Sequence, residues 1–244
     1  MHGAGPEVVI ATIALALIFA FGKKIRFPET GALRDWVSAS AGASVAYIWI
    51  HVIPELNEHQ QQFLQAAGPH LPAPQFRVYV CGLIGFICFY GFQHMRSREV
   101  VHPHAPGQPE HIKVYRLYLI GFFFYVALVG YLMVETAERG LMSLIAYWLA
   151  MALHFVSVNR SFEEGGEEYY EKRGRWLLVA GILIGGFVGM NVTLDIRIVA
   201  TLLGLLSGAV IVNSVMLELF TKREGKFLPF LVGAAVFAAL LALI

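Results

Sequence analysis

Two histidines and two glutamates lie close together in the stretch IHVIPELNEH, at the end of a long apolar run. They are His51, Glu55, Glu58 and His59, which follow one another at spacings of four, three and one. In a continuing helix these spacings place the side chains on roughly one stripe. Imidazole nitrogens and carboxylate oxygens bind zinc-type cations, so one interpretation is a metal site. The other is a solvated helix end in which His51 pairs with Glu55.

Pro54 interrupts this stretch. A proline inside a helix has no backbone N–H to donate, and its ring clashes with the carbonyl four residues earlier, here that of Ile50. We therefore expect the helix to be kinked close to the four polar residues.

The composition explains why these residues border an apolar run. Of the 244 residues, 57% are hydrophobic and 14% are charged, which is too apolar for an ordinary soluble domain. The net charge is +1 and no basic stripe is present, which argues against nucleic-acid binding. The sequence therefore predicts an integral membrane protein whose partner is the lipid bilayer.

Eight apolar segments follow one another along the chain, several of them near the roughly 20 residues that a helix needs to cross a bilayer. Backbone groups in lipid must be satisfied internally, and no segment shows the alternation of a barrel strand, so all should be helical. The expected segments are Val8–Gly22, Trp36–Glu55, Phe76–Gln93, Tyr115–Val134, Leu141–Val158, Trp176–Thr193, Ile196–Leu219 and Phe227–Ile244. The fold class is then all-α, with eight transmembrane helices in a single domain, 1–244.

The positive charges orient these helices. If the eight helices alternate in direction, 15 of the 18 Lys and Arg residues lie on one side, which leaves Arg77, Arg139 and Arg197 on the other. By the positive-inside rule the side with 15 is cytoplasmic. Both termini are then extracytoplasmic, in a plasma membrane or a bacterial inner membrane.

Two loops on the cytoplasmic side carry polar sequence. The loop 94–114 contains three prolines with His102, His104 and His111, which is typical either of a plain flexible linker or of a tract that binds metal loosely. The loop 159–175 places five glutamates beside four basic residues. That pattern is typical of a solvated face, and a cation-exit funnel or a partner-docking surface is the alternative.

The second and seventh apolar segments resemble each other. Both SAGASVAYIWIHVIPEL and LSGAVIVNSVMLELF have a small-residue opening, an aliphatic middle and a glutamate near the end. Because the two helices would run in opposite directions, the similarity is that of an inverted repeat, although a shared small-residue packing face would also explain it.

With these two helices, eight segments and a His-bearing third loop, the chain resembles the ZIP family of divalent-metal transporters. The resemblance implies two inverted three-helix repeats around a central pair, the fourth and fifth helices, which carry the metal ligands in the family. It also implies alternating access and a zinc-type substrate.

The central ligands are where the chain departs from that family. In place of the family's fourth-helix motif, YVALVG keeps only Gly130, and in the fifth helix HFVSVN keeps only His154. Zinc sites use three or four ligands, so the resemblance leaves a site reduced to His154. Its possible neighbours are Tyr125, Ser157, Asn159 and Asn213. We expect the remaining space to be packed by Tyr125, Val126, Val129, Phe155 and Val158, with His154 close to a tyrosine hydroxyl or a carbonyl.

Two functions remain open. The first is a ZIP-like carrier that moves a divalent cation, or another small solute, by alternating access, with outer capture by His51 and Glu55 and a reduced central site at His154. The second is a non-transporting interaction or regulatory protein with the same fold. No nucleophile, base and oxyanion set indicates an enzyme, and a homo-oligomer is compatible with the sequence.

Overall fold

The computed structural model describes residues 5–22, 31–67, 74–101, 109–164, 169–219 and 226–243. Within these ranges the chain is helical apart from short connections, and no strand occurs among them. The elements in chain order are α1 (Pro6–Phe21), α2 (Gly31–Tyr47), the π-helix η2 (Ile48–Val52), α3 (Ile53–Ala67), the 3-10 helix η3 (Pro74–Phe76), α4 (Arg77–Val101), α5 (Pro109–Glu138), α6 (Leu141–Glu164), the π-helix η4 (Tyr170–Gly174), α7 (Arg175–Asn191), α8 (Ile196–Leu219) and α9 (Phe227–Ala242).

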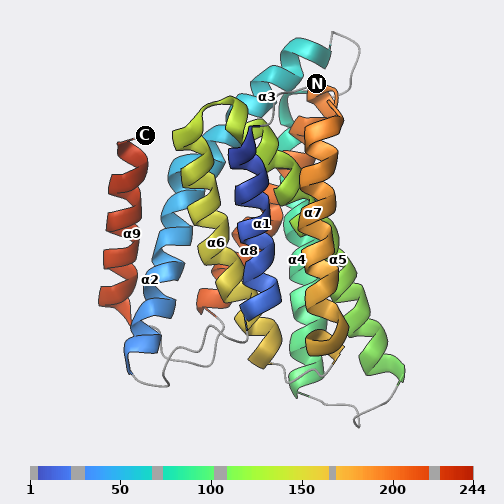
Figure 1. Cartoon of the computed structure of the whole chain (residues 1–244), viewed down its shortest axis with the longest axis vertical. Helices are drawn as coiled ribbons and strands as arrows, with labels where there is room; N and C mark the ends of the chain where they lie inside the picture. Colours follow the sequence, from blue (N-terminus) through green and yellow to red (C-terminus); the bar gives the residue numbers. More distant parts are fainter. Residues whose placement is uncertain are drawn as a thin grey trace.

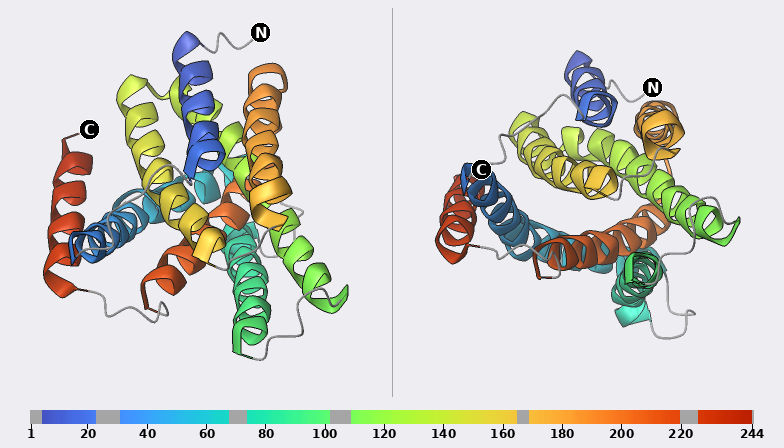
Figure 2. Two further views of the ribbon diagram at one scale, coloured as in Figure 1. Left: turned by 60° about the horizontal axis from the view of Figure 1, so that its bottom comes forward. Right: turned by 90° about the horizontal axis from the view of Figure 1, so that it is seen from below.

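The long helices stand side by side and form two layers (Figure 1). One layer contains α1, α5, α6 and α7, and the other contains α2, α4, α8 and α9, as the view along the helices in Figure 2 shows. The most extensive helix contacts fall within a layer, where α5 packs along α7, α4 along α8 and α2 along α9. Contacts between the layers are sparser. We call the end of the bundle where α3 lies the α3 end, and the described chain both begins and finishes there.

Glycines allow the helices within a layer to approach closely. A methyl group on Gly208 of α8 would lie 1.9 Å from the carbonyl oxygen of Gly82 in α4. In the other layer, a methyl group on Gly185 of α7 would lie 1.8 Å from the carbonyl oxygen of Ala127 in α5. Small residues at such positions are typical of helix pairs in membranes, where packing rather than water drives association. Each layer therefore contains closely fitted helix pairs.

Among the described residues, four stretches of helix are long and apolar enough to cross a membrane. They are Arg77–Met95, Tyr115–Glu138, Tyr170–Asn191 and Ile196–Asn213. Three shorter apolar helices, Pro6–Phe21, Leu141–Val156 and Phe227–Ala242, accompany them. At 1.5 Å per residue, a 16-residue helix such as α1 is about 24 Å long. The expected all-helical class is thus present in the described residues, and these elements are consistent with a membrane protein.

The expected segment Trp36–Glu55 is part of a longer, irregular helix. α2 passes without a break into the π-helix η2, where the backbone N–H of Ile53 bonds to the carbonyl oxygen of Ile48, and then into α3. Pro54 lies directly after this wide turn, which accommodates the missing donor and the bulky ring. A π-turn therefore lies next to Pro54, where a kink was expected, and the helix continues beyond it to Ala67.

Helices also extend into both expected cytoplasmic loops. α4 continues to Val101 and α5 begins at Pro109, so helix covers part of 94–114. α6 continues to Glu164, and η4 begins at Tyr170. Hydropathy marks only the apolar part of a helix, and polar turns can extend it into water. His102 and His104 lie outside the described residues, and of His111 only the helical backbone is described.

Candidate functional site

Arg139 brings together the polar residues of the stretch IHVIPELNEH. Its Nη1 lies 3.1 Å from Glu55 Oε1 and 3.7 Å from Glu58 Oε2. Its Nη2 lies 3.1 Å from Nε2 of His59. His59 Nε2 is in turn 3.8 Å from Oε1 of Glu135. The guanidinium of one arginine therefore stands among three acids and a histidine at the α3 end.

The backbone fixes Arg139 firmly at this place. Only Arg139 and Gly140 separate α5 from α6, and Gly140 has a φ of 123°, in the left-handed region that favours glycine. The backbone N–H of Arg139 donates to the carbonyl oxygen of Thr136, and that of Gly140 to the carbonyl oxygen of Ala137. Because the turn is tight and bonded, the arginine moves with α5 and α6.

The hydrogen bond to Arg139 determines the tautomer of His59. A guanidinium can only donate, so Nε2 of His59 accepts and its Nδ1 carries the hydrogen. That Nδ1 is buried and has no hydrogen-bond partner. The His59 side chain is 1% exposed, whereas that of Glu58 is 63% exposed. The two neighbours thus differ in burial although both reach Arg139, with His59 in the interior and Glu58 at the water-exposed rim.

His51 belongs to the edge of this group. Its Nε2 lies 3.8 Å from Oε2 of Glu55, and its ring stacks on Tyr47 with centroids 5.0 Å apart. This pairing with Glu55 is the contact expected of a helix end. We call His51, Glu55, Glu58, His59, Glu135 and Arg139 the outer cluster.

Burial changes the acid–base properties of α3, which is not among the candidate membrane spans. Burial raises the pKa of Glu55 from 4.5 to about 7, against the opposing effect of the Arg139 charge. Burial also lowers the pKa of His59 from 6.5 to about 4, and the Arg139 charge acts in the same direction. Desolvation disfavours the charged form of either group. His59 is therefore neutral at pH 7, as its acceptor role requires.

The outer cluster has ligand-type atoms but not the arrangement of a metal site. No group of three or more His, Cys, Asp or Glu among the described residues is placed to hold a metal ion. Glu55, Glu58 and His59 are instead directed at the Arg139 guanidinium. In this state the arginine supplies the positive charge that would otherwise come from a cation.

His154 lies on α6, and its side chain is in the packed interior of the helix bundle. Its side chain is 2% exposed, and its ring stands edge-on to Tyr125 with centroids 5.9 Å apart. Neither its Nε2 nor the hydroxyl of Tyr125 has a hydrogen-bond partner. The surrounding positions expected to be apolar and aromatic are buried as predicted: Tyr125, Val126, Val129, Phe155 and Val158. A neighbouring tyrosine was expected, and Tyr125 contacts the His154 ring without a hydrogen bond from its hydroxyl.

The other expected neighbours of His154 pair with different side chains. The hydroxyl of Tyr170 donates to Oδ1 of Asn159 at 2.5 Å. Nε2 of Gln93 donates to Oδ1 of Asn213 at 3.0 Å and so joins α4 to α8. The side chain of Ser157 lies outside the described part of the structure. Tyr125 is thus the expected neighbour that the structure places against His154.

Sequence reasoning missed Glu135 and Arg139. Both are far from α3 in the chain, Arg139 by 80 residues from His59. One signal was available, because Arg139 is one of only three basic residues on its side of the predicted topology. An isolated cation beside an acidic helix end is a reasonable candidate for an ion pair.

Comparison of the chain with protein-family models, with curated proteins and with solved structures finds no match.

Proposed function

We propose that this chain is a ZIP-like membrane carrier that moves a small cation of the divalent-metal class by alternating access. The observation that carries the proposal is the division of the helices into two layers with sparse contacts between them. Alternating access requires two bodies that keep their own packing while the surface between them opens first on one side and then on the other. The fitted glycine contacts within each layer favour such rigid bodies.

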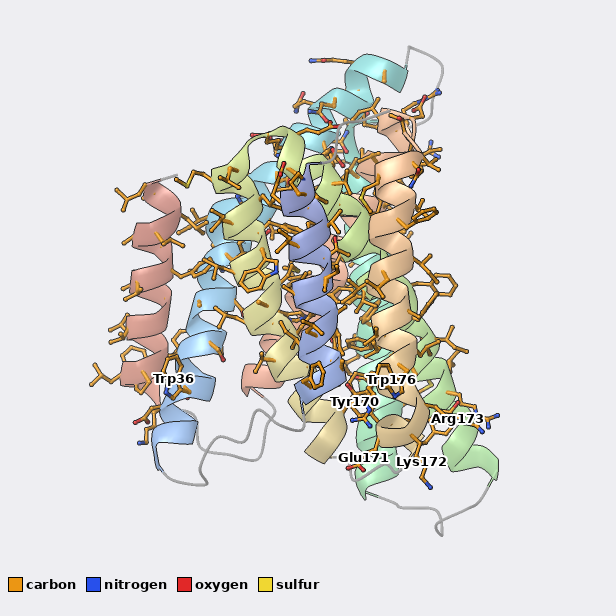
Figure 3. The ribbon with its side chains drawn as sticks, viewed as in Figure 1. Trp36, Tyr170, Glu171, Lys172, Arg173 and Trp176 are labelled. Atoms are coloured by element: carbon orange, nitrogen blue, oxygen red, sulfur yellow. The ribbon has the colours of Figure 1, made fainter. Side chains whose placement is uncertain are left out.

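Aromatic and charged residues support the proposed orientation. Trp36 and Trp176 are exposed at the end opposite α3, with Lys172 and Arg173 beyond Trp176 (Figure 3). Tryptophans at the lipid–water boundary and basic residues beyond them are typical of a cytoplasmic membrane surface. We infer that eight helices or helix pairs span the bilayer and that the α3 end, with both termini, is extracytoplasmic.

His154 is our candidate for the central residue of the transport path. An ionisable side chain within a membrane domain is expensive to bury and often marks a transport path. Its unpartnered Nε2 is a free acceptor or donor, and the ring of Tyr125, whose hydroxyl is also unpartnered, packs against its imidazole. A single imidazole binds a divalent ion weakly. The ion would therefore keep much of its water shell as it passes, or it would pass in a conformation of the protein in which water enters the transport path.

One observation favours the alternative function, a non-transporting regulatory or interaction protein. Buried side chains surround His154, and Glu55 and Glu58 of the outer cluster already pair with Arg139. A protein with this packing could be held in one state and respond to a partner without moving a solute.

Transport by purified protein in liposomes distinguishes the two functions. We expect zinc or a similar divalent cation to enter vesicles that contain the protein and a metal-sensitive dye, and His154→Ala to lower the initial rate about tenfold. His94→Ala is the matched control, because His94 is exposed on α4. Absence of flux for divalent cations, with correctly folded protein in the vesicles, would leave the non-transporting function.

A further inference from the structure

The two layers meet along α2 and α6 and along α4 and α5, and α5 and α6 also touch α8. Two of the side-chain contacts between the layers lie at different depths. Phe89 of α4 packs against Phe122 and Tyr125 of α5, with ring centroids 5.4 and 5.5 Å apart. Arg139 at the end of α5 bonds to α3. Along α5 the separation between Tyr125 and Arg139 is about 21 Å at 1.5 Å per residue. An aromatic contact within the bundle and an ionic contact at the α3 end are therefore among the contacts that join the layers.

The ionic contact connects elements that belong to different bodies. α3 packs on α8 and α4 of one layer, and Val78 of α4 donates its N–H to Gln60 of α3 at 2.9 Å. Tyr79 of α4 also donates to Asn57 of α3 at 2.9 Å. Arg139, by contrast, is held by the turn between α5 and α6 of the other layer. Its contacts with Glu55, Glu58 and His59 thus cross from one body to the other.

Several other side-chain contacts remain within a layer. Trp148 of α6 donates to the carbonyl oxygen of Ala11 in α1, and Tyr147 of α6 donates to that of Val129 in α5. Lys226 at the start of α9 pairs with Asp35 of α2 at 2.7 Å. These bonds would survive a movement of the layers as whole bodies, whereas those of Arg139 would break.

We propose that Arg139 is an ionic latch that holds the two helix layers together at the α3 end. A charge-assisted hydrogen bond has a defined length and direction, so it is either made or broken. Aromatic packing at Phe89 tolerates small rotations because it is less directional. Release of Arg139 lets the layers separate at the α3 end while they stay in contact deeper in the bundle.

The surroundings of Arg139 also allow its contacts with α3 to break. Three different partners share one guanidinium, and Arg139 is 32% exposed, so water can replace these partners as it leaves. Glu135, in the last turn of α5 and four residues before the arginine, lies within the outer cluster and has an unpartnered Oε2. That oxygen is an acceptor available within the layer when the contacts to α3 break.

Distance measurements between spin labels test the latch in the complete chain. In a background without the native cysteines Cys81 and Cys88, labels at Gln61 of α3 and Met142 of α6 report the separation of the layers, since both positions are exposed. Labels at Met142 and Val192 lie within one layer and should keep their distance. The measurement is made at pH 8, where the carboxylates are ionised.

We expect Arg139→Gln to raise the ratio of long to short Gln61–Met142 distances about tenfold over the otherwise unmutated labelled protein. Glu55→Gln removes the charge of the nearer carboxylate on the opposite side and should act in the same direction. Arg197→Gln is the control. Arg197 forms an ion pair at 2.8 Å with Asp195, which is two residues before it in the chain, so this pair does not join the two layers. Unchanged distances in folded Arg139→Gln or Glu55→Gln protein would overturn the latch. The readout does not involve transport, so the latch and the carrier proposal can fail separately.

Discussion

Gly208 of α8 lies so close to Gly82 of α4 that a single methyl group on Gly208 would come within 1.9 Å of the Gly82 carbonyl oxygen. The same methyl group would also lie 2.6 Å from the backbone nitrogen of Phe86. Backbone atoms cannot move aside as a flexible side chain can. The contact therefore sets the separation of α4 and α8, the most closely packed helix pair of this layer.

Gly208→Ala should separate α4 from α8 and destabilise the protein by about 3 kcal/mol, since overpacking a well-fitted interface forces the backbone to shift. Gly91→Ala is the matched control, because a methyl group there meets nothing within 4 Å. Alanine is the better helix former, so the control should be neutral or stabilising by up to about 1 kcal/mol. Unfolding of the detergent-solubilised variants measures both. Equal midpoints for the two variants would contradict the close contact.

The class of the fold could be predicted because hydropathy acts locally. Continuous apolar runs such as Ile196–Leu219 must be helical in lipid, and the matching helix is present. The division into layers could not be predicted in this way, because it depends on which helices pair. That choice comes from backbone approaches such as Gly85 against Leu205, which join residues far apart in the chain.

The candidate site shows the same contrast. Pro54 disturbs its own helix by a local steric effect, so an irregular turn could be expected next to it. The partners of Glu55 could not be expected from spacing, because Arg139 comes from another layer. Spacing along one helix shows which side chains share a face, but not which charge that face meets.

Glu55 should make the stability depend on pH between about 4.5 and 7. Its pKa is raised on folding, to about 7, so the folded state binds the proton more tightly. The contribution of Glu55 to the free energy of unfolding is fully present below pH 4.5 and is lost as the pH rises through 7. Glu55→Gln should remove this loss, on the order of 2 kcal/mol, when unfolding is measured from pH 5 to 8.

His59 acts in the opposite direction and must be separated from Glu55 in that experiment. Its pKa is lowered to about 4, so its contribution is full above pH 6.5 and is lost as the pH falls toward 4. The comparison is therefore made between the natural protein and the Glu55→Gln variant at each pH, with Glu58→Gln as an exposed control. A parallel pH dependence in all three proteins would refute the assignment to Glu55.

Tyr170→Phe should destabilise the protein by about 1 to 2 kcal/mol, because the buried amide of Asn159 would lose a hydrogen bond while the ring stacking on Phe162 is kept. Tyr79→Phe is the matched control, since it removes the same kind of bond, to Asn57, at an exposed position. It should cost less than about 0.5 kcal/mol. Thermal unfolding in detergent provides the comparison, and a larger loss at Tyr79 would contradict it.

The topology predicts that a tag after Ile244 is labelled by a membrane-impermeant reagent in intact cells. The reason is that 15 of the 18 basic residues lie on the opposite side, which the positive-inside rule assigns to the cytoplasm. A tag inserted near Pro106 should be protected until the cells are opened. The reverse pattern would overturn the orientation and the ZIP-like assignment with it.

His154→Leu should leave the protein equally stable or raise its free energy of unfolding by about 1 kcal/mol. The Nε2 atom of His154 is buried without a partner, and such a group costs free energy that an apolar side chain does not. Tyr125 and Phe155 would still pack against the new side chain, as both already contact the imidazole ring. Unfolding in detergent gives the stability, and the zinc flux assay gives the activity of the same preparation. A stable variant without flux would show that His154 is kept for transport, whereas a marked loss of stability would show instead that the imidazole holds the helices together.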